Sequence, residues 1–311
     1  MKPNLKRYLK ISKDIVQAQV QGEPIVALES TVITHGLPYP KNIKLAQDME
    51  AEVRRGGAVP ASIAVLDGKI HVGLNIEQLE YLATASGVRK ASPRDFSRMV
   101  IKGESGGTTV AGTIFIAHKM DIKVFATGGI GGVHRQPSSD VSADLPQLAQ
   151  TPIIVVCAGA KAILDLPATL EYLETHGVPV IGYQTNEFPA FYSANSNLPT
   201  NVRADSPEEI IKIASTHWGL GMSSSVLVTQ PPPPEVALPE NEMREAIEQA
   251  LDTARREGLQ GQDVTPFLLQ RVSELTGNAS LQANLGLLLN NAYLAAKIAH
   301  KMGQNQDIKS I

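Results

Sequence analysis

Short apolar runs that stop abruptly at polar or glycine residues recur along this chain, and they limit most strongly what it can fold into. Residues 25–28 (IVAL), 124–127 (VFAT), 153–156 (IIVV) and 180–183 (VIGY) are such runs. Uniformly apolar runs of this length are typical of strands that are buried on both faces of a sheet. We therefore predict that these runs form interior strands.

Segments with helical spacing of apolar residues lie between these runs. We expect helices at 1–20, 41–55, 76–85, 110–118 and 167–175. Strands that alternate with helices predict an α/β fold, here a three-layer α/β/α sandwich around a mostly parallel central sheet. Asp67-Gly68 between the apolar runs 61–66 and 69–72 is a strong hairpin signal, so the sheet is expected to be mixed.

The composition changes after Gln230, where residues 231–234 are four consecutive prolines. Such a run is stiff and extended and cannot lie inside a helix. We interpret 231–239 as a strap that leads to a helical C-terminal segment, 240–303, in which 240–257 and roughly 266–300 are helical. Pro266 suits a first helical turn, and Gly277 suits a helix stop. A helical segment this short needs a partner surface to bury its apolar side chains. We therefore expect 1–311 to form a single α/β/α domain.

The overall composition excludes several classes of protein. The chain has 311 residues, a formal net charge of −3 and 43% apolar residues, so nucleic-acid binding is not expected. The only cysteine, Cys157, cannot form an internal disulfide. Residues 1–24 lack an uninterrupted apolar core and 280–296 contain four amides, so we expect neither a signal peptide nor a membrane span, and a cytoplasmic location.

Two charged residues follow predicted strands and are candidates for catalysis. Lys161 lies just past 153–156, and Glu29 directly follows 25–28. Open α/β sheets bind ligands at the carboxyl ends of their strands. A desolvated lysine can attack a carbonyl, and a carboxyl group with a raised pKa can act as a general acid or base. The alternatives are a solvated lysine that starts a helix, and a helix cap or structural ion pair for the glutamate.

Two glycine-rich segments could hold an anion. Gly106-Gly107-Thr108-Thr109 precedes the helix predicted to begin at Val110, and the N-terminus of a helix attracts anions. Residues 128–135 (GGIGGVHR) follow a predicted strand and end with two possible phosphate donors, His134 and Arg135. Lys90 could add a positive charge, although a solvated lysine is the simpler interpretation.

Carboxylates and amides provide two further candidates. Asp140 and Asp144, with Ser142 between them, would share a face of a helix, and their oxygens suit Mg²⁺ or Mn²⁺. An acidic cap before Leu145 is the alternative. Asn284, Asn290 and Asn291 interrupt an apolar helix, either as hydrogen-bonding groups of the core or as ligand contacts.

Taken together, these segments resemble the pseudouridine-5′-phosphate glycosidases, also called indigoidine synthase A-like proteins. The resemblance runs from about residue 10 to residue 300. The residues that carry it are 27–40 (ALESTVITHGLPYP), 106–113 (GGTTVAGT), 126–135 (ATGGIGGVHR), 140–145 (DVSADL) and 157–161 (CAGAK).

The resemblance implies the reversible conversion of pseudouridine 5′-phosphate and water to uracil and ribose 5-phosphate. It implies that Glu29 is the proton donor and Lys161 the nucleophile. Such a pair makes chemical sense, because a C-glycoside has no leaving oxygen to protonate and therefore needs an amine and an acid. A Schiff-base aldolase acting on a phosphorylated sugar, or a non-catalytic nucleotide-binding protein, are the alternatives.

The resemblance also implies how the remaining groups are used. Asp140 would bind one Mn²⁺ per subunit, and the family members look like homotrimers. Substrate contacts would fall on Lys90, Thr109, Val110, His134, Ser142, Ala143, Asp144 and Asn284. One departure is visible, because Gln136-Pro137 stand where a small residue or glycine is expected.

Overall fold

The computed structural model describes residues 5–135, 140–259 and 264–304. Its strands are β1 (Leu9–Ile11), β2 (Ile25–Leu28), β3 (Val59–Leu66), β4 (Lys69–Val72), β5 (Arg89–Ala91), β6 (Gly106–Thr108), β7 (Val124–Ala126), β8 (Ile154–Cys157), β9 (Val180–Tyr183), β10 (Val202–Ala204) and β11 (Val226–Thr229). The predicted interior strands are thus confirmed, and the hairpin at Asp67-Gly68 joins β3 to β4 as expected.

The α-helices are α1 (Lys13–Gln21), α2 (Lys41–Arg55), α3 (Ile76–Thr84), α4 (Phe96–Lys102), α5 (Val110–Lys119), α6 (Asp144–Ala149), α7 (Leu166–Thr175), α8 (Pro207–Gly219), α9 (Glu240–Arg256), α10 (Val264–Leu275) and α11 (Ala279–Gln304). Three short helical turns are η1 (Lys6–Tyr8), the π-helix η2 (Val32–Gly36) and η3 (Pro93–Asp95). In the described ranges, no helix is both long and apolar enough to cross a membrane.

The central sheet is mixed and mostly parallel, as predicted. Its strand order is β1-β4-β3-β2-β7-β8-β11-β9-β10, with β6 beside β3 and β5 beside β6. In this spatial order, every pair from β3–β2 to β9–β10 is parallel, whereas β3 is antiparallel to β4 and to β6. Strands β7, β8 and β11 are buried along their whole length, which explains their uniformly apolar sequences.

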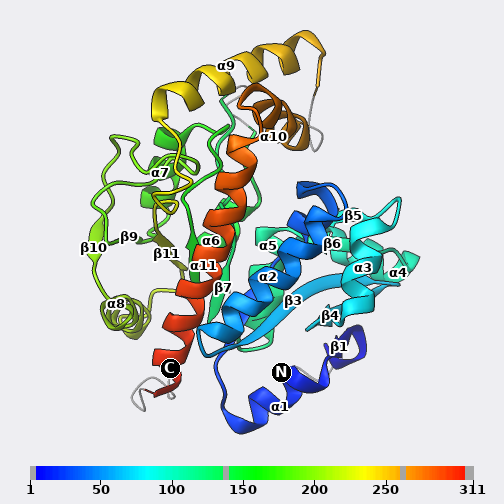
Figure 1. Cartoon of the computed structure of the whole chain (residues 1–311). Coiled ribbons are helices and arrows are strands. Elements are labelled where there is room, and N and C mark those ends of the chain that lie inside the picture. The colour runs from blue at the N-terminus through cyan, green and yellow to red at the C-terminus, as the bar shows by residue number, and fades with distance from the viewer. Residues whose placement is uncertain (1–4, 136–139, 260–263, 305–311) are drawn as a thin grey trace.

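Helices cover the sheet in layers. Helices α2 and α11 lie side by side in front of the sheet in Figure 1, while α5 and α6 lie behind it. The α/β fold with helices at its C-terminal end is as predicted. Helix α11 packs on α2 and against β7 and β8, so the C-terminal helices have the partner surface that the sequence requires; the single domain and the strap at 231–239 stay predictions.

Two local expectations were wrong. The predicted opening helix is interrupted, because Leu9–Ile11 pairs with β4 and Ser12 then caps α1 by accepting a hydrogen bond from Ile15 N at 3.3 Å. The glycine loop at 106–109 is largely strand β6. The helix stop expected at Gly277 is confirmed, because α10 ends at Leu275 and the chain turns with positive φ at Gly277 and Asn278.

The glycines of β6 have a packing reason. A Cβ atom at Gly107 would lie 2.5 Å from Thr34 Oγ1 and 2.7 Å from Ser30 O. These distances are too short for any side chain, so only glycine lets β6 approach the segment that follows β2. Ser30 Oγ fills the junction by donating to Ile63 O at 2.6 Å and accepting from Thr108 N at 2.9 Å. The chain just after β2 is therefore held firmly at the edge of the sheet.

Candidate active site

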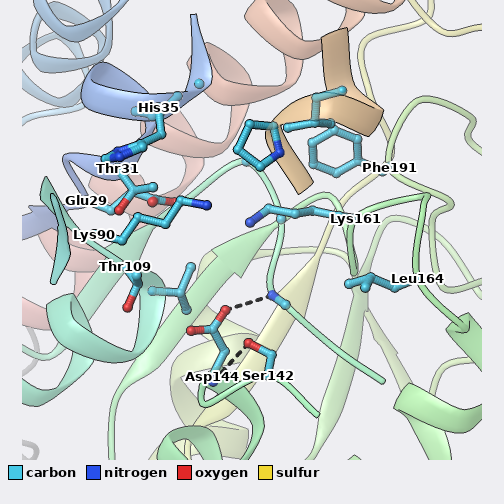
Figure 2. A pocket seen from close by; sticks show the side chains of 18 of the residues that line it. Glu29, Thr31, His35, Lys90, Thr109, Ser142, Asp144, Lys161, Leu164 and Phe191 are labelled. Carbon is cyan, nitrogen blue, oxygen red and sulfur yellow. Dashed lines mark hydrogen bonds between the residues drawn. The ribbon is translucent and has the colours of Figure 1, made fainter. Parts of the chain in front are cut away.

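One cavity collects nearly all the residues that the sequence singles out, at the ends of β2, β6, β7 and β8 (Figure 2). Of the predicted site residues, those lining it are Glu29, Lys90, Thr109, Val110, His134, Ser142, Ala143, Asp144, Lys161 and Asn284. Asp140 is the exception and does not line this cavity. The juxtaposition of Glu29 and Lys161 matters most, because their separation would have removed the basis for joint chemistry.

Glu29 is a buried acid at the end of β2. Glu29 is 9% exposed, and its Oε1 accepts a hydrogen bond from Thr127 Oγ1. Burial raises the pKa of Glu29 above 4.5; Lys161 and the Thr127 hydroxyl oppose the rise, Asp144 adds to it, and Lys90 opposes it. The carboxyl group therefore keeps its proton to a higher pH than an exposed glutamate, as a general acid must.

Lys161 lies on a tight turn after β8. Its N–H donates to Ile130 O at 3.1 Å, and its carbonyl accepts from Leu164 N at 2.9 Å. Gly159 makes the turn possible with a φ of +88°, and a Cβ atom there would lie 2.3 Å from Pro189 O. Figure 2 shows the amines of Lys161 and Lys90 pointing towards each other across the cavity. An amine is thus held beside the acid and open to a small ligand.

The N-terminus of α5 forms one wall. Thr109 caps the helix by accepting a hydrogen bond from Gly112 N at 3.2 Å, and its hydroxyl lies 3.1 Å from Ser92 Oγ. Val110 is the first residue of the helix, so its N–H has no acceptor within it. Lys90, on β5, lines the same cavity. A helix N-terminus, hydroxyls and a lysine together suit a phosphate group.

Asp144 holds two walls of the cavity together. Its Oδ1 accepts from Ala111 N and its Oδ2 from Gly131 N, each at 2.8 Å. It is 6% exposed and begins helix α6. The carboxylate thus joins the start of α5 to the glycine loop. The contact between Asp144 and substrate that the resemblance implies stays a prediction.

Asp140 lies apart from Asp144. The prediction that the two share a face of a helix was wrong, because α6 begins only at Asp144. Asp140 precedes α6, and the neighbouring Val141 pairs with Val133 in an isolated bridge. The Asp140 carboxylate is 48% exposed, and its Oδ2 lies 3.9 Å from Nδ1 of His134. His134 N also donates to Asp140 O at 2.9 Å. The departure at Gln136-Pro137 lies outside the described residues.

The donor set at Asp140 is compatible with only one kind of metal site. In the described part of the chain there is no cluster of three or more histidine, cysteine, aspartate or glutamate side chains that could hold a metal. Both oxygens of Asp144 are already occupied by backbone N–H groups. A single half-exposed carboxylate fits a divalent ion that keeps most of its water shell, as Mg²⁺ and Mn²⁺ do.

The contacts of helix α11 distinguish Asn284 from Asn291. Asn284 lines the cavity. Asn291 is fully buried, donates through Nδ2 to Thr127 O at 2.8 Å, and accepts at Oδ1 from Gln230 Nε2 at 2.9 Å. Asn291 is therefore a hydrogen-bonding group of the core, whereas Asn284 is available to a ligand.

Some of the lining was not anticipated. An apolar side is formed by Phe191, Pro266, Leu269 and Leu288, and other lining residues are Thr31, Val32, Gly36, Ser92 and Leu164. His35, which also lines the cavity, has a pKa lowered below 6.5 by burial and by Lys90. Phe191 could not be found from local sequence, because it comes from an irregular segment. Thr127, which contacts Glu29 from behind the cavity, could have been found, because it is the polar residue that ends the predicted strand 124–127.

An α/β sheet with a buried acid, a lysine and a helix N-terminus in one cavity at its strand ends defines an enzyme that acts on a small anionic molecule. Residues 14–301 match the family model described as indigoidine synthase A like protein. The chain belongs to this family and is an enzyme.

Individual relatives agree with this assignment. The chain is 52% identical over 297 residues to a pseudouridine-5′-phosphate glycosidase from Geobacillus kaustophilus, covering 95% of this chain and 99% of the relative. It is 53% identical over 298 residues to one from Paracoccus denitrificans, covering 94% and 98%.

Two solved structures have the same fold. The prealnumycin C-glycosynthase AlnA, in complex with ribulose 5-phosphate, superposes with a TM-score of 0.89 at 38% identity, covering 97% of this chain and 99% of that one. An indigoidine synthase A-like protein from Thermotoga maritima superposes with a TM-score of 0.87 at 35% identity, covering 95% and 96%.

Proposed function

We propose that this enzyme cleaves the C–C glycosidic bond of pseudouridine 5′-phosphate with water, giving uracil and ribose 5-phosphate in a reversible reaction. The observation that carries the proposal is the presence of Glu29 and Lys161 in one cavity beside the N-terminus of α5. The names of the close relatives support the substrate. The ribulose 5-phosphate in the complex of the C-glycosynthase supports a phosphorylated pentose as the class of ligand.

The phosphate end of the substrate is expected at the N-terminus of α5. Val110 N–H, Thr109 and Lys90 line the cavity and would contact the phosphate. Binding the phosphate holds C1 of the sugar within reach of Lys161 while the ribose ring opens, because binding energy at a remote group can be used to orient the reacting atoms.

The chemistry that we propose uses the amine and the acid in turn. The neutral amine of Lys161 bonds to C1 of the sugar as the bond from C1 to the ring oxygen breaks and that oxygen takes a proton. Glu29 then delivers a proton to the uracil carbon that is bonded to C1. The C–C bond breaks as the nitrogen lone pair forms an imine with C1, and uracil leaves. Water hydrolyses the imine to release ribose 5-phosphate and restore the lysine.

A direct assay tests this function. Incubation of the purified enzyme with pseudouridine 5′-phosphate and Mn²⁺ is expected to release uracil and ribose 5-phosphate in equal amounts, measured by chromatography. Pseudouridine without its phosphate is expected to react far more slowly, because it lacks the group that binds at α5. Borohydride trapping of an aldose phosphate without any uracil release would instead identify a Schiff-base aldolase.

We further propose that Asp140 holds one Mn²⁺ per subunit, largely through a shell of water. The half-exposed carboxylate beside His134 supports this role. When bound, such an ion with its waters can orient uracil or polarise its carbonyl. The homotrimer that the resemblance implies stays a prediction.

Removing the metal is expected to suppress turnover. Treatment with a chelator should lower the rate of uracil release, and added Mn²⁺ should restore it, because the ion and its waters are proposed to orient or polarise uracil. Asp140→Asn should need at least ~10-fold more Mn²⁺ for half-maximal activity. Asp121→Asn, at an exposed carboxylate paired with Lys123, serves as the control. An enzyme that is indifferent to chelation would contradict the metal role.

A further inference from the structure

Thr127 contacts the acid from behind the cavity. It follows β7, is fully buried and does not itself line the cavity. Its Oγ1 donates a hydrogen bond to Oε1 of Glu29.

The position of the Thr127 hydroxyl is fixed through its backbone. Thr127 N donates to Val156 O at 3.0 Å, and Thr127 O accepts from Asn291 Nδ2 at 2.8 Å. Asn291 is held in turn by Gln230 Nε2 at 2.9 Å. Strand β8, helix α11 and the end of β11 therefore all restrain the residue that holds Glu29, although none of these contacts involves the cavity.

We propose that Thr127 is a positioning residue that decides which oxygen of Glu29 carries the acidic proton. Because Oε1 accepts the bond from the Thr127 hydroxyl, the proton of the neutral acid is directed to Oε2. The inference rests on the proposed function, in which that proton is transferred to the uracil carbon. It assigns to Thr127 a role that acts through Glu29 without contact with substrate.

The charged groups around Glu29 are independent of the Thr127 hydroxyl. The titratable groups that line the same cavity are Lys90, Lys161, Asp144, His35 and His134. Both oxygens of Asp144 accept backbone N–H groups, and the lysines come from β5 and from the turn after β8. All of them remain in place when only the Thr127 hydroxyl is removed, so a substitution there isolates one hydrogen bond.

Two variants test the inference. Thr127→Val keeps the shape of the side chain and removes the donor, whereas Thr127→Ser keeps the donor. Thr127→Val is expected to lower kcat for uracil release roughly 10- to 100-fold with little change in KM, and Thr127→Ser to restore most of the rate. Donation to a carboxylate lowers its pKa, so the alkaline limb of the rate profile of Thr127→Val should move up by about one pH unit.

This combination is specific to positioning. A higher pKa alone would leave more Glu29 protonated at neutral pH and, by making it a weaker acid, would slow proton transfer by less than about 10-fold. An unchanged kcat in Thr127→Val, a limb that stays or moves to lower pH, or a serine variant as slow as the valine variant would overturn the inference. A downward limb would mean that Thr127 accepts the proton of Glu29 instead of donating to it.

A readout without turnover separates this inference from the proposed function. The carboxyl ¹³C resonance of Glu29, assigned by its absence in Glu29→Gln, should titrate about one pH unit higher in folded Thr127→Val than in the wild type. The same titration in both proteins would overturn the role of Thr127 even if uracil is released. A wild type that titrates as expected but releases no uracil would overturn the function and leave the hydrogen bond assigned.

Discussion

Replacing Lys161 by alanine is expected to abolish uracil release, with a loss of at least roughly 10⁴-fold in kcat, because a covalent route disappears with its nucleophile. The fold should survive. Lys161 is partly exposed on a turn, and its hydrogen bonds to Ile130 and Leu164 use backbone atoms only. A thermal unfolding midpoint close to that of the wild type, measured beside the rate, checks that the loss is chemical.

Trapping experiments make the result specific to the imine. Borohydride reduction in the presence of ribose 5-phosphate should leave a covalent adduct on the wild type and on Lys102→Ala, an exposed lysine at the end of α4, and none on Lys161→Ala. Mass spectrometry of the intact protein and of its peptides measures this. Turnover by Lys161→Ala at the wild-type rate would eliminate the imine mechanism.

Replacing Glu29 by glutamine is expected to lower kcat for uracil release by roughly 10²- to 10⁴-fold. The amide is neutral like the protonated acid and can still accept the hydrogen bond of Thr127 through its oxygen, but it has no acidic proton to give. Because Lys161 is untouched, the variant should still form the trapped adduct with ribose 5-phosphate. Proton transfer and imine formation are thereby separated.

The role of Glu29 as proton donor also predicts the direction in which the rate changes with pH. Burial raises the pKa of Glu29, and the reaction needs the protonated form, so the wild-type rate should fall as the pH rises through that raised pKa. This limb should be missing from the residual activity of Glu29→Gln. Glu77→Gln, an exposed glutamate in the first turn of α3, should keep both the rate and the limb. A limb that persists in Glu29→Gln would belong to another group.

The parts of the fold that could be predicted are those in which burial determines the sequence. Strands β7 and β8 are enclosed on both faces and are therefore uniformly apolar. Strand β11 (VLVT) is also buried along its whole length, and its sequence would have allowed the same prediction. By contrast, β10 exposes two of its three residues, and β5 and β6 read RKA and GGT. These strands exist because their neighbours pair with them, which no local pattern encodes.

The same limit separates the predicted from the unpredicted parts of the cavity. Glu29 and Lys161 were within reach because a charged residue just after an apolar strand is conspicuous. Phe191 lies on an irregular segment with a positive φ and is seated by Gly129, where a Cβ atom would lie 2.6 Å from its ring. Its place depends on a contact between residues 62 positions apart (191 − 129), and only the folded chain reveals it.

The order in which the residues lining the cavity are synthesised has a consequence for the nascent chain. Pro266, Leu269, Asn284 and Leu288 belong to the last two helices, yet they enclose a site whose acid and amine were made long before. A nascent chain that has reached residue 230 already carries both reactive groups but lacks this side of the enclosure. On the ribosome, the enclosure of the cavity is therefore completed late, when the last two helices have been made and the final helix docks against the sheet.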